Sequence, residues 1–163
     1  MPLENRRRII IAFDNSKISR TVLDWAKGHV FRPNQDHVTI VTVTEDGESY
    51  FEPTYFQGFI SGKWGFEERQ NYLKELSEKA ENTIAELSAE LAKMGITSNP
   101  VVIKAADAKK SLVEATVNYK ADMLIVGSRG LHGLKRAVLG SVSEYCINHC
   151  ECPVLVHKGN TKA

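Results

Sequence analysis

Residues 8–16 read Arg-Ile-Ile-Ile-Ala-Phe-Asp-Asn-Ser, and this stretch decides the fold. The first six residues form a short apolar run, and the polar triplet after them is typical of a turn into a helix. We therefore predict a buried strand over 8–13, followed by a helix in which apolar residues from Ile18 to Val30 recur at helical spacing.

The rest of the chain repeats this alternation. Apolar runs rich in β-branched residues predict strands at 38–43, 100–104, 123–126 and 153–157. Helices are predicted over 141–149, over 111–119 with Tyr119 facing inward, and along a stretch whose apolar face comprises Leu73, Leu76, Ala80, Ile84, Leu87, Leu91 and Met94. Strands that are apolar on both faces and separated by helices predict an open, doubly wound, parallel five-stranded α/β sheet with helices on both faces, a Rossmann-like fold. Such folds bind ligands beyond the carboxyl ends of their strands, which points to the residues after Phe13, Val43 and Val126.

Length and composition fit a single domain over 1–163. The chain has 163 residues, 42% apolar and 25% charged, enough to bury a core without disulfide or metal support. A net charge of +1 gives no broad field for a polyanion, so we expect no nucleic-acid partner. No stretch approaches the roughly 18 consecutive apolar residues of a membrane helix, and residues 1–8 lack the apolar part of a secretory signal. We therefore expect no membrane partner and a cytoplasmic location, and three cysteines crowded near the C-terminus also favour a reducing compartment.

A glycine-rich segment follows the strand predicted at 123–126. It begins Gly-Ser-Arg-Gly at 127–130 and ends Gly-Ser-Val-Ser at 140–143, directly before a predicted helix. Glycine lets main-chain amides approach a ligand closely, and a helix start offers a phosphate free amides and about half a positive charge. Ser141 and Glu144 also match a capping box, in which each side chain satisfies an amide of the helix start. Neither a Walker-type phosphate loop nor a dinucleotide glycine fingerprint occurs, so glycine spacing alone leaves both a nucleotide site and a structural loop open.

Gly127, Gly130, Gly140 and Ser141 follow a longer pattern: glycine, two residues, glycine, nine residues, then glycine and serine. The opening Ile-Ala-Phe-Asp-Asn-Ser, the Leu-Ile-Val-Gly-Ser-Arg-Gly turn and the Cys-Pro-Val-Leu-Val ending accompany it. In these features the chain resembles the ATP-binding subgroup of the universal stress protein family over nearly its whole length. The resemblance implies a nucleotide-responsive regulatory or stress-tolerance module that binds ATP, ADP or AMP, with or without Mg²⁺, and hydrolyses ATP slowly at most.

The same resemblance implies which residues contact the nucleotide. Asp14 would lie near the ribose or a metal-phosphate group, and Val43 would meet adenine through its backbone. Ala12 would be a further nucleotide-binding residue. The sugar and phosphates would be bordered by Gly127, Arg129 and Gly130, and the phosphate tail would be held by Gly140, Ser141, Val142 and Ser143. A helix cap remains the alternative for Asp14, and Arg129, His132 and Lys135 are equally compatible with pointing into water.

Two places depart from the family pattern. Residues 106–108 read Ala-Asp-Ala where many relatives have Gly-Asp-Pro, a change that should alter a turn more than the nucleotide site. Residues 47–66 hold seven of the thirteen aromatic residues, together with Gly58, Gly62 and Gly65, and show no steady period. We predict a long loop at about 47–66, and our hypothesis is that its aromatic part, Tyr50 to Phe66, covers the nucleotide or contacts a partner.

Other chemistries fit the sequence less well. Cys146, His149, Cys150 and Cys152 are zinc-type ligands, but their spacing is unusual for zinc, and two of the cysteines share a helical face as small apolar residues would. We therefore expect no metal site. No hydrolase nucleophile signature occurs, so no catalytic residue is predicted, and Asp14 is the first candidate for a base in slow ATP hydrolysis. A flavin or dinucleotide enzyme remains an alternative function. A purified protein that is colourless and retains adenine nucleotide would count against this alternative.

The resemblance also implies a homodimer joined through Val154, Leu155 and Val156 of the last strand, since pairing would bury an exposed apolar edge. The alternative is that the chain's own tail, residues 158–163, covers this edge of the last strand. The alternative function from another class is a nucleotide-free dimeric interaction or signalling protein of the same fold. That alternative predicts loss of the glycine-serine cradle, which is present here.

Overall fold

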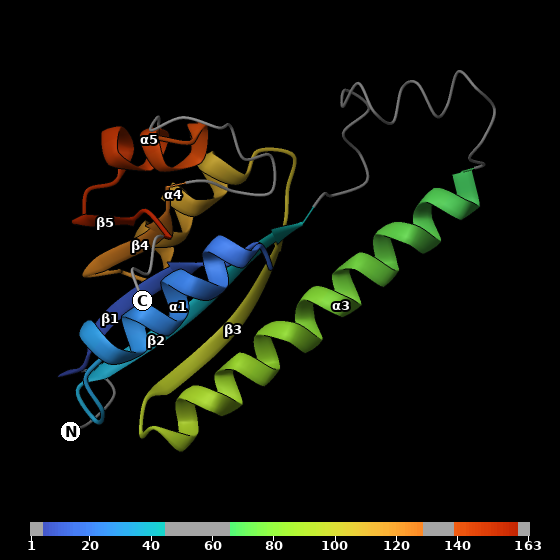
Figure 1. The fold of residues 1–163 in the computed structure, drawn as a ribbon. Helices are drawn as coiled ribbons and strands as arrows, with labels where there is room; N and C mark the ends of the chain where they lie inside the picture. Colours follow the sequence, from blue (N-terminus) through green and yellow to red (C-terminus); the bar gives the residue numbers. More distant parts are fainter. Residues whose placement is uncertain (1–4, 45–65, 129–138, 160–163) are drawn as a thin grey trace.

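The computed structural model describes residues 5–44, 66–128 and 139–159 (Figure 1). Five strands form one parallel sheet in the order β3-β2-β1-β4-β5. The strands are β1 (Arg7–Ala12), β2 (Asp36–Thr44), β3 (Thr97–Lys104), β4 (Met123–Gly127) and β5 (Val154–His157), and the helices are α1 (Lys17–His29), α3 (Phe66–Lys93), α4 (Ala108–Asn118) and α5 (Ser141–His149). The predicted parallel α/β fold is confirmed.

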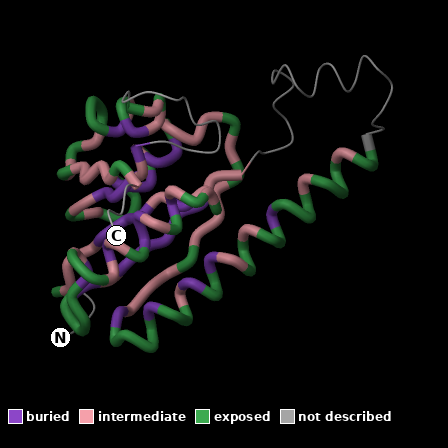
Figure 2. Tube along the Cα trace, viewed as in Figure 1, coloured by how far each residue is buried: buried purple, intermediate pink, exposed green. Residues whose placement is uncertain are grey.

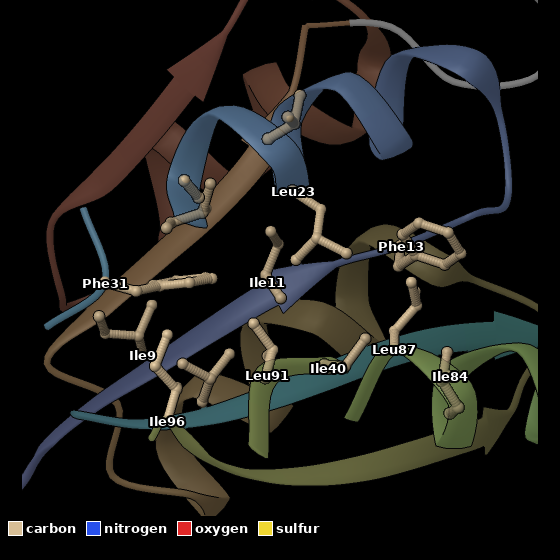
Figure 3. Close-up of a cluster of buried hydrophobic side chains, with 14 residues drawn as sticks. Ile9, Ile11, Phe13, Leu23, Phe31, Ile40, Ile84, Leu87, Leu91 and Ile96 are labelled. Atoms are coloured by element: carbon tan, nitrogen blue, oxygen red, sulfur yellow. The ribbon is translucent and has the colours of Figure 1, made fainter. Parts of the chain in front are cut away.

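The central strand β1 is covered on both faces. Ile9 and Ile11 belong to a core that includes α1 and α3, whereas Ile10 belongs to a second core with α4 and α5. Figure 3 shows the first core, in which Leu23 of α1 and Leu91 of α3 lie around Ile11. Burial on both faces explains why residues 9–11 are uninterrupted isoleucines and do not alternate with polar residues.

The helices divide between the two faces according to the direction in which the chain crosses the sheet. From β1 the chain moves to β2 and β3 through α1 and α3, which share one face. From β4 it moves outward to β5 through α5, which lies with α4 on the opposite face. The winding direction therefore switches between β1 and β4, and we call the carboxyl ends of these two strands the switch point. Open α/β sheets bind ligands at such a place.

Helix α3 begins earlier than predicted and is buried along only part of its length. Ile84, Leu87 and Leu91 are buried in the first core. Leu76 and Met94, both predicted to face inward, are 38% and 42% exposed, so that part of the prediction is wrong. Figures 1 and 2 show that α3 begins beyond the ends of the strands and that little of this first part is buried. At Leu76 the reason is local, because the next residue, Ser77, is the buried one and Leu76 lies to the side of it on the helix. Met94 lies beyond the last residue of the helix.

Element boundaries differ from the prediction mostly at the edges of the sheet. Strand β3 begins at Thr97 rather than at Pro100, and a proline is tolerated there because β3 is an edge strand. Tyr119 is 37% exposed rather than inward, because it is the C-cap that follows α4. Asp107, in the divergent Ala-Asp-Ala segment, caps α4 by accepting the amides of Lys109 and Lys110. None of the described helices combines the length and the apolar character needed to cross a membrane.

Candidate functional site at the switch point

The carboxyl end of β1 is held against β2 by two hydrogen bonds. The Phe13 N–H donates to the Val41 carbonyl over 2.8 Å, and the Thr42 hydroxyl donates to the Phe13 carbonyl over 2.8 Å. Phe13 is buried, so the chain leaves the sheet in a fixed direction. These contacts place the predicted site residues Ala12 and Asp14 at the switch point.

Residues 14–16 form a tight turn into α1. Asp14 Oδ1 accepts the Ser16 N–H at 3.0 Å, and the Ser16 hydroxyl oxygen accepts the Ser19 N–H at 3.1 Å. Asn15, between them, has a φ of 58°, in the left-handed region that asparagine adopts more readily than most residues. Ser16 is therefore the N-cap, and Asp14 holds the turn. The other carboxylate oxygen of Asp14, Oδ2, accepts no hydrogen bond from the described residues.

The two ends of the glycine-rich segment meet at the carboxyl end of β4. The Gly140 N–H donates to the Ser128 carbonyl over 2.7 Å, and the Ser128 N–H donates to the His157 carbonyl over 2.9 Å. Ser128 is buried and directly follows Gly127, the last residue of β4. The structure thus brings together two glycines that the sequence pattern linked only by spacing.

Helix α5 receives no cap from the side chain of its own N-cap residue. That residue is Gly140, which has φ −68° and ψ 155° and no side chain to act as a cap. Ser141 is therefore already helical, and the predicted capping box between Ser141 and Glu144 is wrong. The Glu144 N–H donates to the Gly140 carbonyl over 3.0 Å as an ordinary helical bond. The main-chain amides of residues 141–143 carry the partial positive charge of the helix start.

The side chains at the start of α5 differ in what they can offer a ligand. Ser141 is exposed, Val142 packs against the second core, and Ser143 is buried. The Ser143 hydroxyl donates to the Gly140 carbonyl over 2.9 Å, so its proton is already used. An anion at this turn would therefore meet main-chain amides and the Ser141 hydroxyl.

The other predicted site residues divide into placed and undescribed ones. Val43 lies near the carboxyl end of β2, with its side chain against the second core. Arg129, Gly130, His132, Lys135 and the loop segment 47–65 lie outside the described residues, so their assignments stay predictions. The sequence reasoning missed Thr42 and Ser128, which hold the site together. A polar residue inside an apolar run was the available signal for Thr42, whereas Ser128 acts through its main chain and left no signal.

Three free cysteines gather where α5 ends and β5 begins. Cys146, Cys150 and Cys152 lie in or against the second core, and burial raises the pKa of all three thiols. The fourth zinc-type residue, His149, stacks on Tyr145 with ring centroids 3.8 Å apart. Across the described parts of the chain, no group of three or more such ligands is arranged to hold a metal ion.

The Cys146 thiol should be unreactive in the folded protein. Burial and the neighbouring Cys150 raise its pKa from 9.0 to about 12, so at pH 8 its thiolate fraction falls about a thousandfold. We expect iodoacetamide at pH 8 to modify Cys146 at least a hundredfold more slowly in the native protein than in the urea-unfolded protein, as followed by peptide mass spectrometry. Equal rates in the two states would contradict this expectation.

A cavity of about 460 Å³ opens at the amino-terminal ends of β4 and β5, on the side of the sheet away from the switch point. Its walls come from the end of α4 and the starts of β4 and β5, and they comprise Thr116, Val117, Lys120, Ala121, Asp122, Glu151, Cys152 and Pro153. Charges of both signs line the cavity, and none of the described helices begins among its lining residues. It therefore offers a phosphate fewer favourable contacts than the switch point does.

Comparison with known proteins gives a consistent family signal. A model of the universal stress protein family matches residues 5–158. The universal stress protein MJ0531 of Methanocaldococcus jannaschii is 35% identical over 93% of this chain and 82% of its own length. PHOS34 and PHOS32 of Arabidopsis thaliana are 29% and 27% identical over 93% of the chain, which spans 61% and 64% of their length.

Solved structures share the fold at lower identity. The structure of MJ0577, from the same organism as MJ0531, has a TM-score of 0.75 at 21% identity and covers 98% of this chain and 99% of its own. An Arabidopsis thaliana family protein with AMP bound has a TM-score of 0.58 at 21% identity, covering 95% and 93%. A universal stress protein in complex with cAMP has a TM-score of 0.53 at 19% identity, covering 96% and 99%.

Proposed function

Because the chain belongs to the universal stress protein family, we propose that it binds ATP, ADP or AMP at the switch point and acts as a nucleotide-responsive regulatory or stress-tolerance module. The observation that carries the proposal is the 2.7 Å hydrogen bond from Gly140 to Ser128, which holds the uncapped start of α5 beside the end of β4. Helix starts of this kind bind phosphate through main-chain amides. AMP and cAMP in two proteins of the same fold support a nucleotide as the ligand.

In this proposal the nucleotide lies across the switch point with its phosphates toward α5. The phosphate tail rests on the turn at 140–143, and the sugar lies along 127–130. Asp14 Oδ2 accepts a ribose hydroxyl or contacts a Mg²⁺ ion shared with phosphate oxygens. Ala12 borders the sugar, and the backbone of Val43 meets the base.

Hydrolysis is proposed to be slow at most. Main-chain amides position a phosphate and stabilise its charge, but they supply no general base. We also propose that the chain is one nucleotide-binding domain over 1–163, which the family match over residues 5–158 supports. A cytoplasmic location is proposed as well, and the three free cysteines support a reducing environment.

Analysis of the purified protein tests the proposal directly. Freshly purified protein is denatured in acid, and the released small molecules are identified by mass spectrometry. We expect ATP, ADP or AMP in a fixed ratio to protein, and saturable ATP binding by calorimetry once the nucleotide has been removed. A protein that carries no adenine nucleotide and binds none in calorimetry would overturn the proposal.

The open edge at β5 favours a second role, dimer formation. β5 is the last strand of the described sheet. The carbonyls of Pro153 and His157 accept hydrogen bonds from the main-chain N–H groups of Leu124 and Ser128. The main-chain groups of alternate residues in a parallel strand point to opposite sides. The main-chain groups of Val154 and Val156 therefore point away from β4, and we propose that a second copy pairs there through Val154, Leu155 and Val156.

Val156→Pro is expected to convert a dimer into a monomer. The substitution removes an outward-facing amide and spares the bonds to β4, and an edge strand tolerates proline. Light scattering at several concentrations should show a dimeric wild type and a monomeric, folded variant. A monomeric wild type, or a variant that remains dimeric, would contradict the assignment. A wild-type dimer without nucleotide would favour the alternative, an interaction or signalling protein.

A further inference from the structure

Thr44, the last residue of β2, carries a buried hydroxyl with no hydrogen-bond partner in the described chain. Its main-chain carbonyl is used by the fold, since it accepts the Ala105 N–H at 2.9 Å. A buried polar group without a partner costs free energy, and such groups are uncommon in native proteins. The unused hydroxyl therefore calls for a reason.

The neighbouring threonine on the same face of β2 shows the contrast. Side chains alternate along a strand, so Thr42 and Thr44 point to one face and Val43 to the other. The Thr42 hydroxyl donates to the Phe13 carbonyl over 2.8 Å and ties β2 to the end of β1. The hydroxyl of Thr44 makes no such bond, so holding the strands together does not explain it.

Thr44 stands where the base of the nucleotide is proposed to bind. It follows Val43, whose backbone is assigned to adenine, and as a whole residue it is only half-buried. Rotation about the Cα–Cβ bond exchanges the methyl and hydroxyl groups between staggered positions. Because the hydroxyl has no hydrogen bond to the described residues, rotation toward a ligand breaks none of the hydrogen bonds that the structure shows.

We infer that Thr44 is a base-reading residue whose hydroxyl hydrogen-bonds the polar edge of the purine bound beside Val43. A hydroxyl both donates and accepts, so it can pair with a ring nitrogen or with an exocyclic amine. The inference rests on the proposed nucleotide site and adds a side-chain contact to a base otherwise held by main-chain groups.

Three variants and two measurements test it. Thr44→Val replaces the hydroxyl with a methyl group of similar size, Thr44→Ser keeps the hydroxyl, and Thr42→Val removes the hydroxyl that the fold uses. ATP affinity is measured by calorimetry, and stability without nucleotide by the thermal midpoint. We expect Thr44→Val to weaken ATP binding five- to tenfold, which corresponds to the loss of about one hydrogen bond, and Thr44→Ser to stay within twofold.

The stability measurement checks the premise separately. Without nucleotide, Thr44→Val should raise the thermal midpoint because it removes an unpaired buried group, and Thr42→Val should lower it. Unchanged ATP affinity in Thr44→Val, equal weakening in Thr44→Val and Thr44→Ser, or a lowered midpoint in Thr44→Val would each overturn the inference. Failure of the proposed function looks different, because the wild-type protein itself would then not bind ATP.

Discussion

Gly140→Val is expected to lower the affinity for ATP at least a hundredfold, equivalent to about 3 kcal/mol, while the protein stays folded. The backbone at Gly140 has φ −68° and ψ 155°, which valine adopts without strain. Glycine is therefore not needed there for its conformation, and in the proposed site its role is to leave space beside the amides of residues 141–143. A valine side chain would occupy the position proposed for phosphate.

Gly28→Val is the matched control for this experiment. Gly28 lies in α1, and a Cβ built on it meets nothing within 4 Å. Calorimetry should give wild-type affinity for this variant and strongly reduced affinity for Gly140→Val. Urea denaturation should show a cost of about 1 kcal/mol for Gly140→Val, since a branched apolar residue is a poor N-cap. A folded Gly140→Val protein that binds ATP normally would refute the assignment of the phosphate to this turn.

Asp36→Asn is expected to destabilise the protein by about 3 kcal/mol, because it removes the buried carboxylate of an ion pair whose arginine is partly exposed. Asp36 is fully buried at the start of β2, and Arg7 donates to both of its carboxylate oxygens, from Nε at 3.0 Å and from a terminal nitrogen at 2.8 Å. The Arg32 N–H donates to the same carboxylate over 2.7 Å. The hydrogen bond to Asp36 raises the pKa of Arg7. Arginine is protonated at neutral pH even without a partner, so in the variant the Arg7 guanidinium would keep its charge after losing the Asp36 carboxylate.

Asp24→Asn serves as the control for the loss of an ion pair at the surface. Asp24 pairs with Lys27 at 3.0 Å, but its side chain is 72% exposed, so its removal should cost less than about 0.5 kcal/mol. Urea denaturation of both variants measures the difference. Comparable losses of stability in the two variants would show that the burial of Asp36 is not the cause of the destabilisation. Because Asp36 lies at the amino-terminal edge of the sheet, ATP affinity of the folded Asp36→Asn protein should be unchanged.

The fold could be predicted because its strands are buried on both faces. Uninterrupted apolar runs such as 9–11 identify central parallel strands without knowledge of their neighbours. Prediction from the apolar pattern failed for helix residues, because their burial depends on which face of the helix the completed fold covers. Leu76 has the helical spacing of a core residue, yet it is 38% exposed, since the next residue, Ser77, faces inward in its place.

The candidate site could be predicted in part. The spacing of Gly127, Gly140 and Ser141 pointed to a turn that the structure does form at the carboxyl end of β4, because glycine patterns reflect a close approach of the backbone. That this turn binds a nucleotide stays a prediction. The local hydrogen bonds were harder to predict. The N-cap of α5 is Gly140, one residue before the predicted capping box of Ser141 and Glu144, and the N-cap of α1 is Ser16. A shift of one residue changes which main-chain amide receives a hydrogen bond. The amino-acid composition of a turn does not reveal such a shift.

By itself, the sequence determined the class of fold, the switch from apolar strand to polar turn after Phe13, and the glycine pattern that the family shares. Only the tertiary structure decided that Gly140 lies against Ser128 and that the Thr42 hydroxyl is hydrogen-bonded, whereas the Thr44 hydroxyl has no partner among the described residues. The physical reason is range. Periodicity and glycine content act on neighbouring residues, whereas the partner of a hydrogen bond is set by whichever strand or turn the completed fold brings within about 3 Å.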